Sequence, residues 1–294
     1  MFEQNLAGNG ASAVYAYGFL ERYTTAILSN SVFTNSRAVN NCLVYLWSCS
    51  CVGLVNTTFS HSVSSGLCIS DVSGSCEGSN TFLFNRSTIA TSSATDSTIS
   101  DFFVGDVSIG ISVDIRDSSF SYLSPVWNTH TDAFGAAGAI VINQSPYVVL
   151  NDITATNNVG RQGAAIQLDA VQTAVIWIAS FVSNIAAYEG GAVAMVDSHG
   201  QGLLLAEVNA SNNSALSGGA VYGGPGTSIN IIGNTNLTNN TALRTGGAIS
   251  ATSSQKIQIQ NSTMDSNMAW AGGGLYCDQC VQVILDTSQF VNNK

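Results

Sequence analysis

Short apolar runs separated by Gly, Asn and Ser recur along the chain, and this pattern is typical of short β-strands joined by tight turns. The runs occupy residues 139–142, 147–150, 174–178, 203–208, 229–232, 257–259 and 281–285. No segment keeps a 3.6-residue apolar period over a dozen residues, which excludes solenoids built from helices. The pattern therefore predicts an all-β chain.

Two rows of sequence markers share one period. The tetrapeptides AGAI, GAAI, GGAV, GGAV, GGAI and GGGL align without gaps, and their last residues, Ile140, Ile166, Val193, Val221, Ile249 and Leu275, are spaced by 26 to 28 positions. The second row is Asn158, Asn184, Asn212, Asn240, Asn267 and Asn293. Several of these asparagines follow an apolar residue by three positions, as Asn293 follows Phe290. Two independent rows indicate a structural repeat of about 27 residues.

A repeat of this length with short strands predicts one coil of a right-handed, single-stranded parallel β-helix of about ten coils, stacked at about 4.8 Å. Propeller blades need about 40 residues or more per repeat, and the Leu-x-x-Leu-x-Leu framework of leucine-rich repeats is absent. We expect the glycines at positions of positive φ or close backbone approach. We expect the asparagines to form a ladder of amide hydrogen bonds at a turn, and a ligand-binding row is the alternative interpretation.

The whole chain is expected to form one β-helix domain, because no Pro-rich or charged linker divides it. Three parts are expected: degenerate coils with cysteines in 1–79, an irregular or enlarged coil in 80–135, and regular coils in 136–294. In the second part Phe102 and Ile140, which should be equivalent, are 38 positions apart. We therefore expect an inserted loop around 121–135.

The cysteines offer a test of the register. Cys42 and Cys68 are 26 positions apart, and Cys49 and Cys76 are 27 apart, so each pair is expected to stack on adjacent coils. A stacking distance of about 4.8 Å lies within the Cα separation of about 4.4 to 6.8 Å that a disulfide needs. Cys42–Cys68 and Cys49–Cys76 are therefore candidate disulfides, with Cys51 as the rival partner of Cys76. A stack of reduced cysteines is the alternative.

A further pair of cysteines, Cys277 and Cys280, forms a single CxxC motif. A zinc site would need a second pair, and a thioredoxin-type motif would need a βαβ setting. A local Cys277–Cys280 disulfide or two free thiols are the remaining interpretations.

Composition restricts the partners. Charged residues are 9% of the 294, and the net charge is −10. Without clustered Lys and Arg, nucleic acid is not an expected partner. No stretch approaches the roughly 18 apolar residues of a transmembrane helix. The first twenty residues show no basic segment followed by an apolar core, so we expect a trimmed N-terminus or an incomplete piece of a longer protein.

Sequons for N-glycosylation are frequent, although a chain this rich in Asn, Ser and Thr contains several by chance. They lie at Asn56, Asn85, Asn143, Asn209, Asn212, Asn236, Asn239 and Asn261. These are candidate sites if the protein passes through a eukaryotic secretory route.

Catalysis is not expected, and no metal or cofactor is expected. Glycoside hydrolysis needs two carboxylates across a cleft, and polysaccharide lyases need a base, often with Ca²⁺. The acidic cluster comprises Asp96, Asp101, Asp106, Asp114 and Asp117, with Arg116 beside it. Asp114 and Arg116 fit a surface ion pair as well as a site, and His199 has no catalytic neighbours in the sequence. A polysaccharide-binding or polysaccharide-degrading enzyme remains the alternative function.

The GGA[ILV] and Phe-x-x-Asn motifs over 137–294 resemble the repeats of the chlamydial polymorphic outer-membrane protein family, within the pectin-lyase-like fold. The resemblance implies a right-handed β-helix displayed on a surface, usually for adhesion. The family's export signal and C-terminal outer-membrane barrel are not seen here, so only the fold and surface display are carried over.

The expected function is thus a non-catalytic structural or adhesive role outside the cell or at its surface. The expected partners are a protein or a glycan at the cell surface. Because the sequence begins inside a coil and stops at FVNN, where the next glycine pair is due, we also expect contact with further coils of a parent protein or end-to-end association with a second copy.

Overall fold

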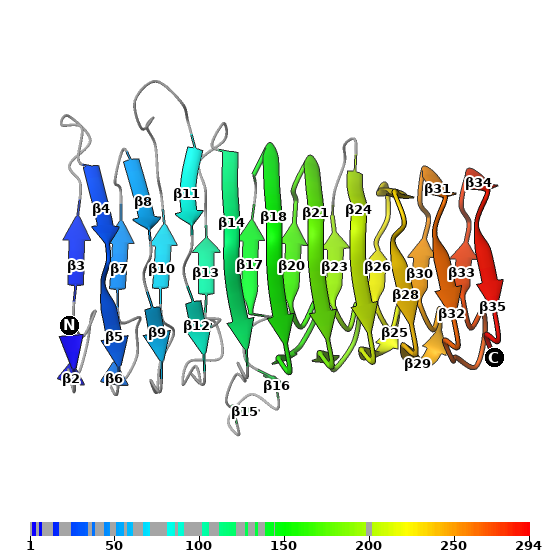
Figure 1. The fold of residues 1–294 in the computed structure, drawn as a ribbon, viewed down its shortest axis with the longest axis horizontal. Helices are drawn as coiled ribbons and strands as arrows, with labels where there is room; N and C mark the ends of the chain where they lie inside the picture. Colours follow the sequence, from blue (N-terminus) through cyan, green and yellow to red (C-terminus); the bar gives the residue numbers. More distant parts are fainter. Residues whose placement is uncertain are drawn as a thin grey trace.

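The structure, a computed structural model, is a parallel β-solenoid (Figure 1). It describes residues 139–143, 145–197 and 202–294 and, before residue 139, the strands named below together with residues 30 and 31. Every pairing between strands of the stacked sheets is parallel, and the described residues contain no helix. The predicted all-β parallel solenoid is therefore confirmed.

Three sheets run along the solenoid axis. Sheet 1 contains β1 (Phe2–Glu3), β4 (Thr25–Ser29), β5 (Val32–Thr34), β8 (Cys51–Val55), β9 (Thr58–Ser60), β11 (Thr81–Asn85), β12 (Thr88–Ala90), β14 (Ser112–Ser121), β18 (Tyr147–Thr156), β21 (Thr173–Val182), β24 (Gly202–Ser211), β27 (Ser228–Ile232), β28 (Asn236–Thr238), β31 (Lys256–Gln260), β32 (Thr263–Asp265), β34 (Gln282–Asp286) and β35 (Gln289–Val291). Sheet 2 contains β3 (Val14–Tyr17), β7 (Val44–Trp47), β10 (Leu67–Ser70), β13 (Phe102–Gly105), β17 (Ile140–Asn143), β20 (Ile166–Asp169), β23 (Val193–Val196), β26 (Val221–Gly223), β30 (Ile249–Thr252) and β33 (Leu275–Asp278). Sheet 3 contains β19 (Val159–Gly160), β22 (Ile185–Ala186), β25 (Ser214–Ser217) and β29 (Thr241–Thr245).

Two small pairs lie outside these sheets. β2 (Leu6–Ala7) pairs with β6 (Arg37–Ala38) in parallel, whereas β15 (Trp127–Asn128) and β16 (Ala133–Phe134) pair antiparallel. β15 and β16 lie beside the stacked strands, between β14 and β17 along the chain (Figure 1). In sheet 2, Phe103 is in register with Val141, an offset of 38 residues. An excursion therefore occurs where the sequence predicted an insertion.

The interior consists of like side chains stacked from coil to coil. In sheet 1 one column is formed by Leu150, Ile176, Leu205, Ile231 and Ile259, which are in register and fully buried. Each such side chain contributes about 1.5 to 3 kcal/mol through burial. In sheet 1, strands such as β18 and β31 alternate buried and outward residues, which leaves the intervening side chains on the surface.

Each regular coil bends at residues with positive φ. One row, directly before the ladder asparagines, is Asn157, Ser183, Asn212, Asn239, Ser266 and Asn292, with φ of 52° to 56°. A second row, within or between the strands of sheet 1, is Asp152, Ile178, Glu207, Asn234, Asn261 and Thr287, with φ of 49° to 60°. Short polar residues tolerate this region, which explains the asparagine-rich turns. Ile178 is the β-branched, apolar exception.

The paired glycines serve two different geometric needs. Gly218 has a φ of +66°, and a Cβ there would lie 2.3 Å from the carbonyl oxygen of Val221. At Gly219 a Cβ would instead lie 2.2 Å from the carbonyl oxygen of Gly247 on the next coil. The first glycine therefore permits the turn into sheet 2, and the second permits the close approach of adjacent coils.

The register near the N-terminus differs from the cysteine prediction. Cys68 is in register with Tyr45, so the expected stacking of Cys68 on Cys42 is wrong. The physical reason is that β7 and β10 are offset by 23 residues, whereas β4 and β8 are offset by 26, because the turns of successive coils differ in length. Cys42, Cys49 and Cys76 lie outside the described residues, and Cys51 is in register with Thr25.

Candidate interaction face on the third sheet

A ladder of asparagines fixes the corner between sheets 1 and 3. In each member after the first, the Oδ1 atom accepts hydrogen bonds from both the backbone N–H and the Nδ2 of the member one coil earlier, at 2.9 to 3.1 Å. The Nδ2 of Asn184 also donates to the carbonyl oxygen of Ala155, and that of Asn240 to Ala210. The members are Asn158, Asn184, Asn213, Asn240, Asn267 and Asn293.

The third member of the ladder corrects the sequence prediction, which named Asn212. Asn213 is fully buried and makes the ladder bonds, whereas Asn212 is exposed and occupies the left-handed corner position. Both are asparagines because the corner favours a residue that tolerates positive φ and the ladder needs an amide. The prediction was therefore wrong by one residue, because Asn212 and Asn213 are adjacent asparagines.

Beyond this corner, sheet 3 presents a strip of projecting side chains, which we call the sheet 3 strip: Arg161, Tyr188, Leu216, Leu243, Arg244 and Trp270. Backbone hydrogen bonds join members on successive coils, from Tyr188 N to Arg161 O and from Leu216 N to Tyr188 O, and the residue after Trp270, Ala271, donates its N–H to Arg244 O. Trp270 is 88% exposed and Leu243 is 75% exposed. The inner side of this sheet carries the small buried residues Ala186 and Ala215, which cluster with Ala164.

A β-bulge shapes the middle of the strip. Ala215 pairs with Ala242 and Ser217 pairs with Thr245, so the single residue Leu216 lies opposite both Leu243 and Arg244. A bulge redirects side chains that a regular strand would alternate between its two faces. As a result, Leu243 and Arg244 are both exposed.

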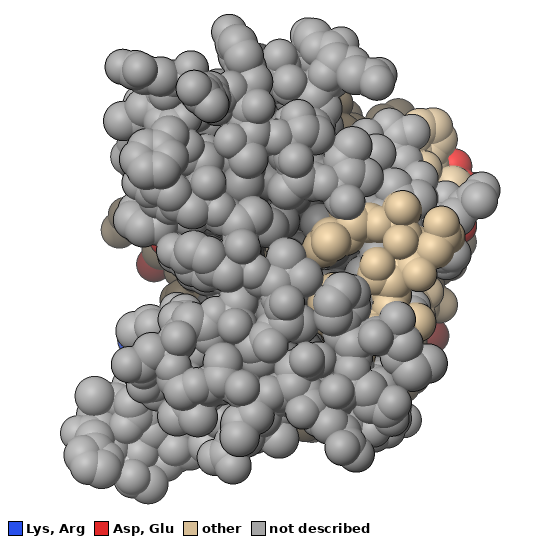
Figure 2. Space-filling view, turned by 90° about the vertical axis from the view of Figure 1, so that its left-hand side faces the viewer, with Lys and Arg blue, Asp and Glu red and all other residues tan. Residues whose placement is uncertain are grey.

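The charges of the described chain are segregated. Three basic residues lie on the sheet 3 side: Arg161, Arg244 and Lys294. On the same side, the carboxylate of Glu189 accepts a hydrogen bond from Gln162 Nε2 at 2.7 Å. Carboxylates dominate elsewhere in the described residues from 139 on: Asp152, Asp169, Asp197, Glu207, Asp265, Asp278 and Asp286, against the single basic residue Lys256. In the end-on view of Figure 2, the small part of the described surface that is visible is mainly uncharged, with acidic residues at its margins.

Neither guanidinium of the strip is neutralised by a described carboxylate. Arg161 lies over the ring of Tyr188, with its Cζ 5.5 Å from the ring centroid. This cation–π contact orients the guanidinium along the strip and leaves its N–H groups available to other acceptors.

A groove lies between the ladder corner and the last coil of sheet 3. Its volume is about 360 Å³, and it is lined by Asn239, Thr241, Ser266, Asn267, Met268, Asn292 and Lys294. The lining combines amide and hydroxyl groups with the half-exposed side chain of Met268 and with Lys294. The groove therefore offers mainly neutral hydrogen-bonding groups together with one basic residue.

A second group of polar residues lies on the outer side of sheet 2. Burial, and then the nearby carboxylate of Asp197, raise the pKa of Asp169 above its ordinary value of 3.8. Burial also raises the pKa of Tyr222, although a hydrogen bond with Thr252 opposes this shift. The members of this group come from different coils, so no local sequence pattern indicates it.

The residues of the predicted acidic cluster are only partly described. Asp114, Arg116 and Asp117 lie in β14, where Asp114 is in register with Leu83 and Val149. The other members, Asp96, Asp101 and Asp106, lie outside the described residues, as does His199. Within the described part of the chain, no group of three or more His, Cys, Asp or Glu residues is placed to hold a metal ion.

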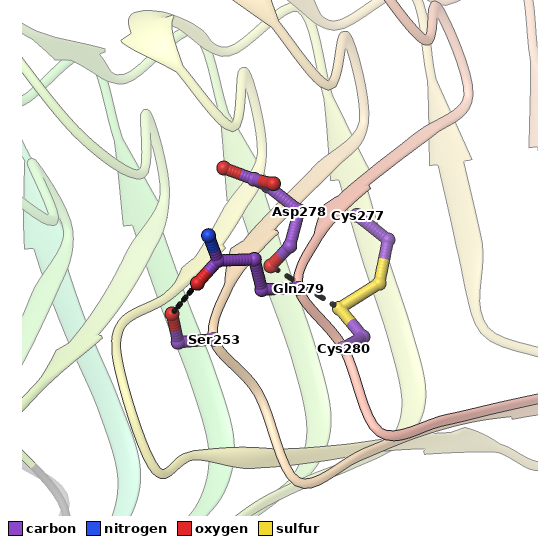
Figure 3. Close-up of a disulfide and its surroundings, with 5 residues drawn as sticks. All are labelled: Ser253, Cys277, Asp278, Gln279 and Cys280. Carbon is purple, nitrogen blue, oxygen red and sulfur yellow. Dashed lines mark hydrogen bonds between the residues drawn. A yellow bond between two sulfur atoms is a disulfide. The ribbon is translucent and has the colours of Figure 1, made fainter.

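Cys277 and Cys280 form a disulfide across a corner of the last coil (Figure 3). The bridge spans Asp278 and the left-handed residue Gln279, whose Oε1 accepts a hydrogen bond from Ser253 Oγ at 3.3 Å. Both cysteines pack against the apolar interior. The bridge therefore closes a structural corner.

The sequons occupy several different environments. Asn209 and Asn236 are exposed on sheet 1 and are directly in register, while Asn212 and Asn239 are exposed at the corner. Asn261 is exposed, and its Nδ2 donates a hydrogen bond to Asn234 Oδ1 at 3.1 Å. Asn85 and Asn143 lie in strands β11 and β17, and Asn56 lies outside the described residues. Glycosylation stays a prediction at all of these positions.

Comparisons with protein family models, curated proteins and solved structures give no match to this chain. The described residues contain no helix with the length and apolar character needed to cross a membrane. The parallel β-solenoid thus rests on the register and hydrogen bonds described above.

Proposed function

We propose that this chain is a non-catalytic structural or adhesive β-solenoid that acts outside the cell or at its surface and binds a protein partner through the sheet 3 strip. One observation carries the proposal: in a chain of net charge −10, exposed aromatic and aliphatic side chains coincide with two arginines that no described carboxylate neutralises. Projecting Trp, Tyr and Arg side chains are the types enriched where proteins bind one another.

The resemblance to polymorphic outer-membrane protein repeats supports the same proposal. The glycine pairs and the asparagine ladder account physically for both repeated motifs, because one allows close coil stacking and the other satisfies the buried corner. Membership of that family and of the pectin-lyase-like fold is part of the proposal, as is the extracellular location.

The adhesive role is tested with two matched triple variants. The first carries Tyr188→Ser, Leu243→Ser and Trp270→Ser on the strip, and the second carries Tyr147→Ser, Trp177→Ser and Ile178→Ser on sheet 1, where those side chains are also exposed. Binding of the purified chain to a panel of intact cells and extracellular matrix proteins is measured. The strip variant should lose binding while the sheet 1 variant keeps it, and equal behaviour of the two folded variants contradicts the proposal.

The coil-to-coil interface supports a second type of contact. Ile259 and Met264 are fully buried by the following coil, whereas their counterparts Leu285 and Phe290 are 53% and 39% exposed. We propose that a further coil, of the parent protein or of a second copy, covers this face. Analytical ultracentrifugation separates the two: a second copy gives a mass that rises with concentration and falls in Leu285→Lys, whereas a strictly monomeric chain excludes self-stacking.

The alternative function, binding or cleavage of a polysaccharide, is favoured by one observation only. The carboxyl groups of Asp169 and Asp197 lie near enough for Asp197 to contribute to the raised pKa of Asp169, and glycosidases use two carboxyl groups together. Release of reducing sugars from a polysaccharide panel, abolished in Asp169→Asn, would establish this function in place of the proposed one.

A further inference from the structure

We infer that the sheet 3 strip binds an extended acidic peptide segment whose carboxylates, four residues apart, bind Arg161 and Arg244. This inference rests on the proposed function and specifies the chemistry of the partner. The juxtaposition that carries it is two unneutralised guanidiniums at the two ends of an exposed apolar row.

The spacing of the two arginines matches an extended chain. Arg161, Tyr188, Leu216 and Arg244 belong to successive coils, so three coil spacings of about 4.8 Å place the arginine backbones about 14 Å apart. An extended peptide rises about 3.4 Å per residue, and residues i, i+2 and i+4 lie on one side. Residues i and i+4 are thus also about 14 Å apart.

The residues between the arginines determine what the middle of the peptide should be. Tyr188, Leu216 and Leu243 form the apolar part of the strip, and the bulge at Leu243 raises that side chain beside Arg244. An apolar side chain at position i+2 would cover this part. Trp270, one coil beyond Arg244, would contact a residue after i+4.

Charge favours carboxylates as the groups bound at both ends. A guanidinium binds a carboxylate through two parallel N–H···O hydrogen bonds, and such pairs are stronger than neutral ones. Of the described acidic residues from 139 on, only Glu189 lies on the sheet 3 side, where its carboxylate accepts a hydrogen bond from Gln162, and the others lie on other faces. An anionic segment therefore meets less repulsion along the strip than elsewhere on the described surface. Binding should therefore weaken as salt screens these charges.

The observations favour a peptide over a glycan. Within sheet 3, coil-to-coil pairing occupies backbone groups, so the face offers side chains and not an open strand edge. The adjacent groove presents the amides of Asn239 and Asn292 and the hydroxyl of Thr241, and amides pair well with the N–H and C=O groups of an extended backbone.

The test uses synthetic peptides and the full chain. A fluorescently labelled peptide with Glu at i and i+4 and Leu at i+2 is titrated by fluorescence polarisation, beside control peptides with Glu at i and i+3, with Lys at i and i+4, and with Ser at i+2. The i, i+4 Glu peptide should bind most tightly. Arg161→Gln and Arg244→Gln should each weaken it about tenfold. Lys256→Gln, which removes a basic residue from sheet 1, serves as the matched control and should leave binding unchanged.

Three results would overturn the inference. They are equal binding of the i+3 and i+4 peptides, insensitivity to both arginine substitutions, and binding of an acidic polysaccharide such as polygalacturonate with no binding of any peptide. If no peptide binds but the strip variant still loses adhesion to cells or matrix, this inference fails and the proposed function stands. If adhesion is also unaffected, both fail.

Discussion

Asn213 receives two hydrogen bonds from Asn184 at a single atom: its Oδ1 lies 3.0 Å from the backbone N and 2.9 Å from the Nδ2 of Asn184. Both residues are fully buried, so the donors of Asn184 are not exposed to bulk water when they lose this acceptor. Asn213 also donates hydrogen bonds from its backbone N–H and Nδ2 to Asn240 Oδ1, and from its Nδ2 to the carbonyl oxygen of Phe181. Its side-chain amide therefore links its own coil to the coils before and after it.

Replacing Asn213 by Ala should destabilise the chain by about 3 kcal/mol, because two buried donors of Asn184 lose their acceptor. Urea unfolding followed by circular dichroism measures this change. The neighbouring substitution Asn212→Gly is the control, since glycine accepts the φ of 56° at that exposed corner, and it should change stability by well under 1 kcal/mol. Equal effects at the two positions would show that the ladder contributes little.

Substitution of the second glycine of each pair should be destabilising because a side chain would clash with the next coil, and this effect does not depend on the backbone angle φ. A Cβ at Gly219 would lie 2.2 Å from the carbonyl oxygen of Gly247, so Gly219→Ala should cost at least about 2 kcal/mol by forcing two coils apart. At Gly224 the nearest atom would be 3.4 Å away, an ordinary contact, so Gly224→Ala should be nearly neutral. Thermal unfolding of both variants makes the comparison, and a neutral Gly219→Ala would mean that the coils are not packed this closely.

Asp169 predicts a pH dependence of stability. Its folded-state pKa is raised by burial and by Asp197, so the folded protein holds the proton more tightly than the unfolded chain does. The stabilisation is fully present below the ordinary value of 3.8 and is lost as the pH rises through the raised pKa. Asp169→Asn should remove this decline, and Asp197→Asn should reduce it. The free energy of unfolding is measured at several acidic and neutral pH values, and an unchanged slope in Asp169→Asn would refute the assignment.

The parts that the sequence predicted are those set by short-range geometry. A left-handed corner followed by a buried amide gives the asparagine doublets, and the glycine pair marks where coils approach, so the solenoid and most ladder positions could be predicted. A ladder asparagine follows an apolar residue by three positions, which should have indicated Asn213 and not Asn212. The apolar residue here is Ala210, which is small and gives only a weak pattern.

The candidate interaction face could not be predicted in the same way. Leu243 and Arg244 are exposed together because β29 has one residue more than β25 opposite Leu216, and that mismatch appears only when two coils are aligned in space. Arg161 and Arg244 are 83 positions apart in the sequence but share a face. The register of Cys68 was missed for a related reason, because turn lengths vary between coils.

Ile178 predicts a stabilising substitution. It occupies a left-handed corner with φ of 52°, where the other regular coils carry Asp, Glu, Asn or Thr, and its side chain is 45% exposed. A β-branched residue in this region is strained by about 1 to 2 kcal/mol, whereas Asn tolerates it, and little apolar burial is lost on replacement. Ile178→Asn should therefore stabilise the chain by about 1 kcal/mol in urea unfolding. The reverse change at the equivalent corner two coils later, Asn234→Ile, should destabilise it by a similar amount. If Ile178→Asn destabilises the chain, the contacts of the isoleucine side chain outweigh the backbone strain.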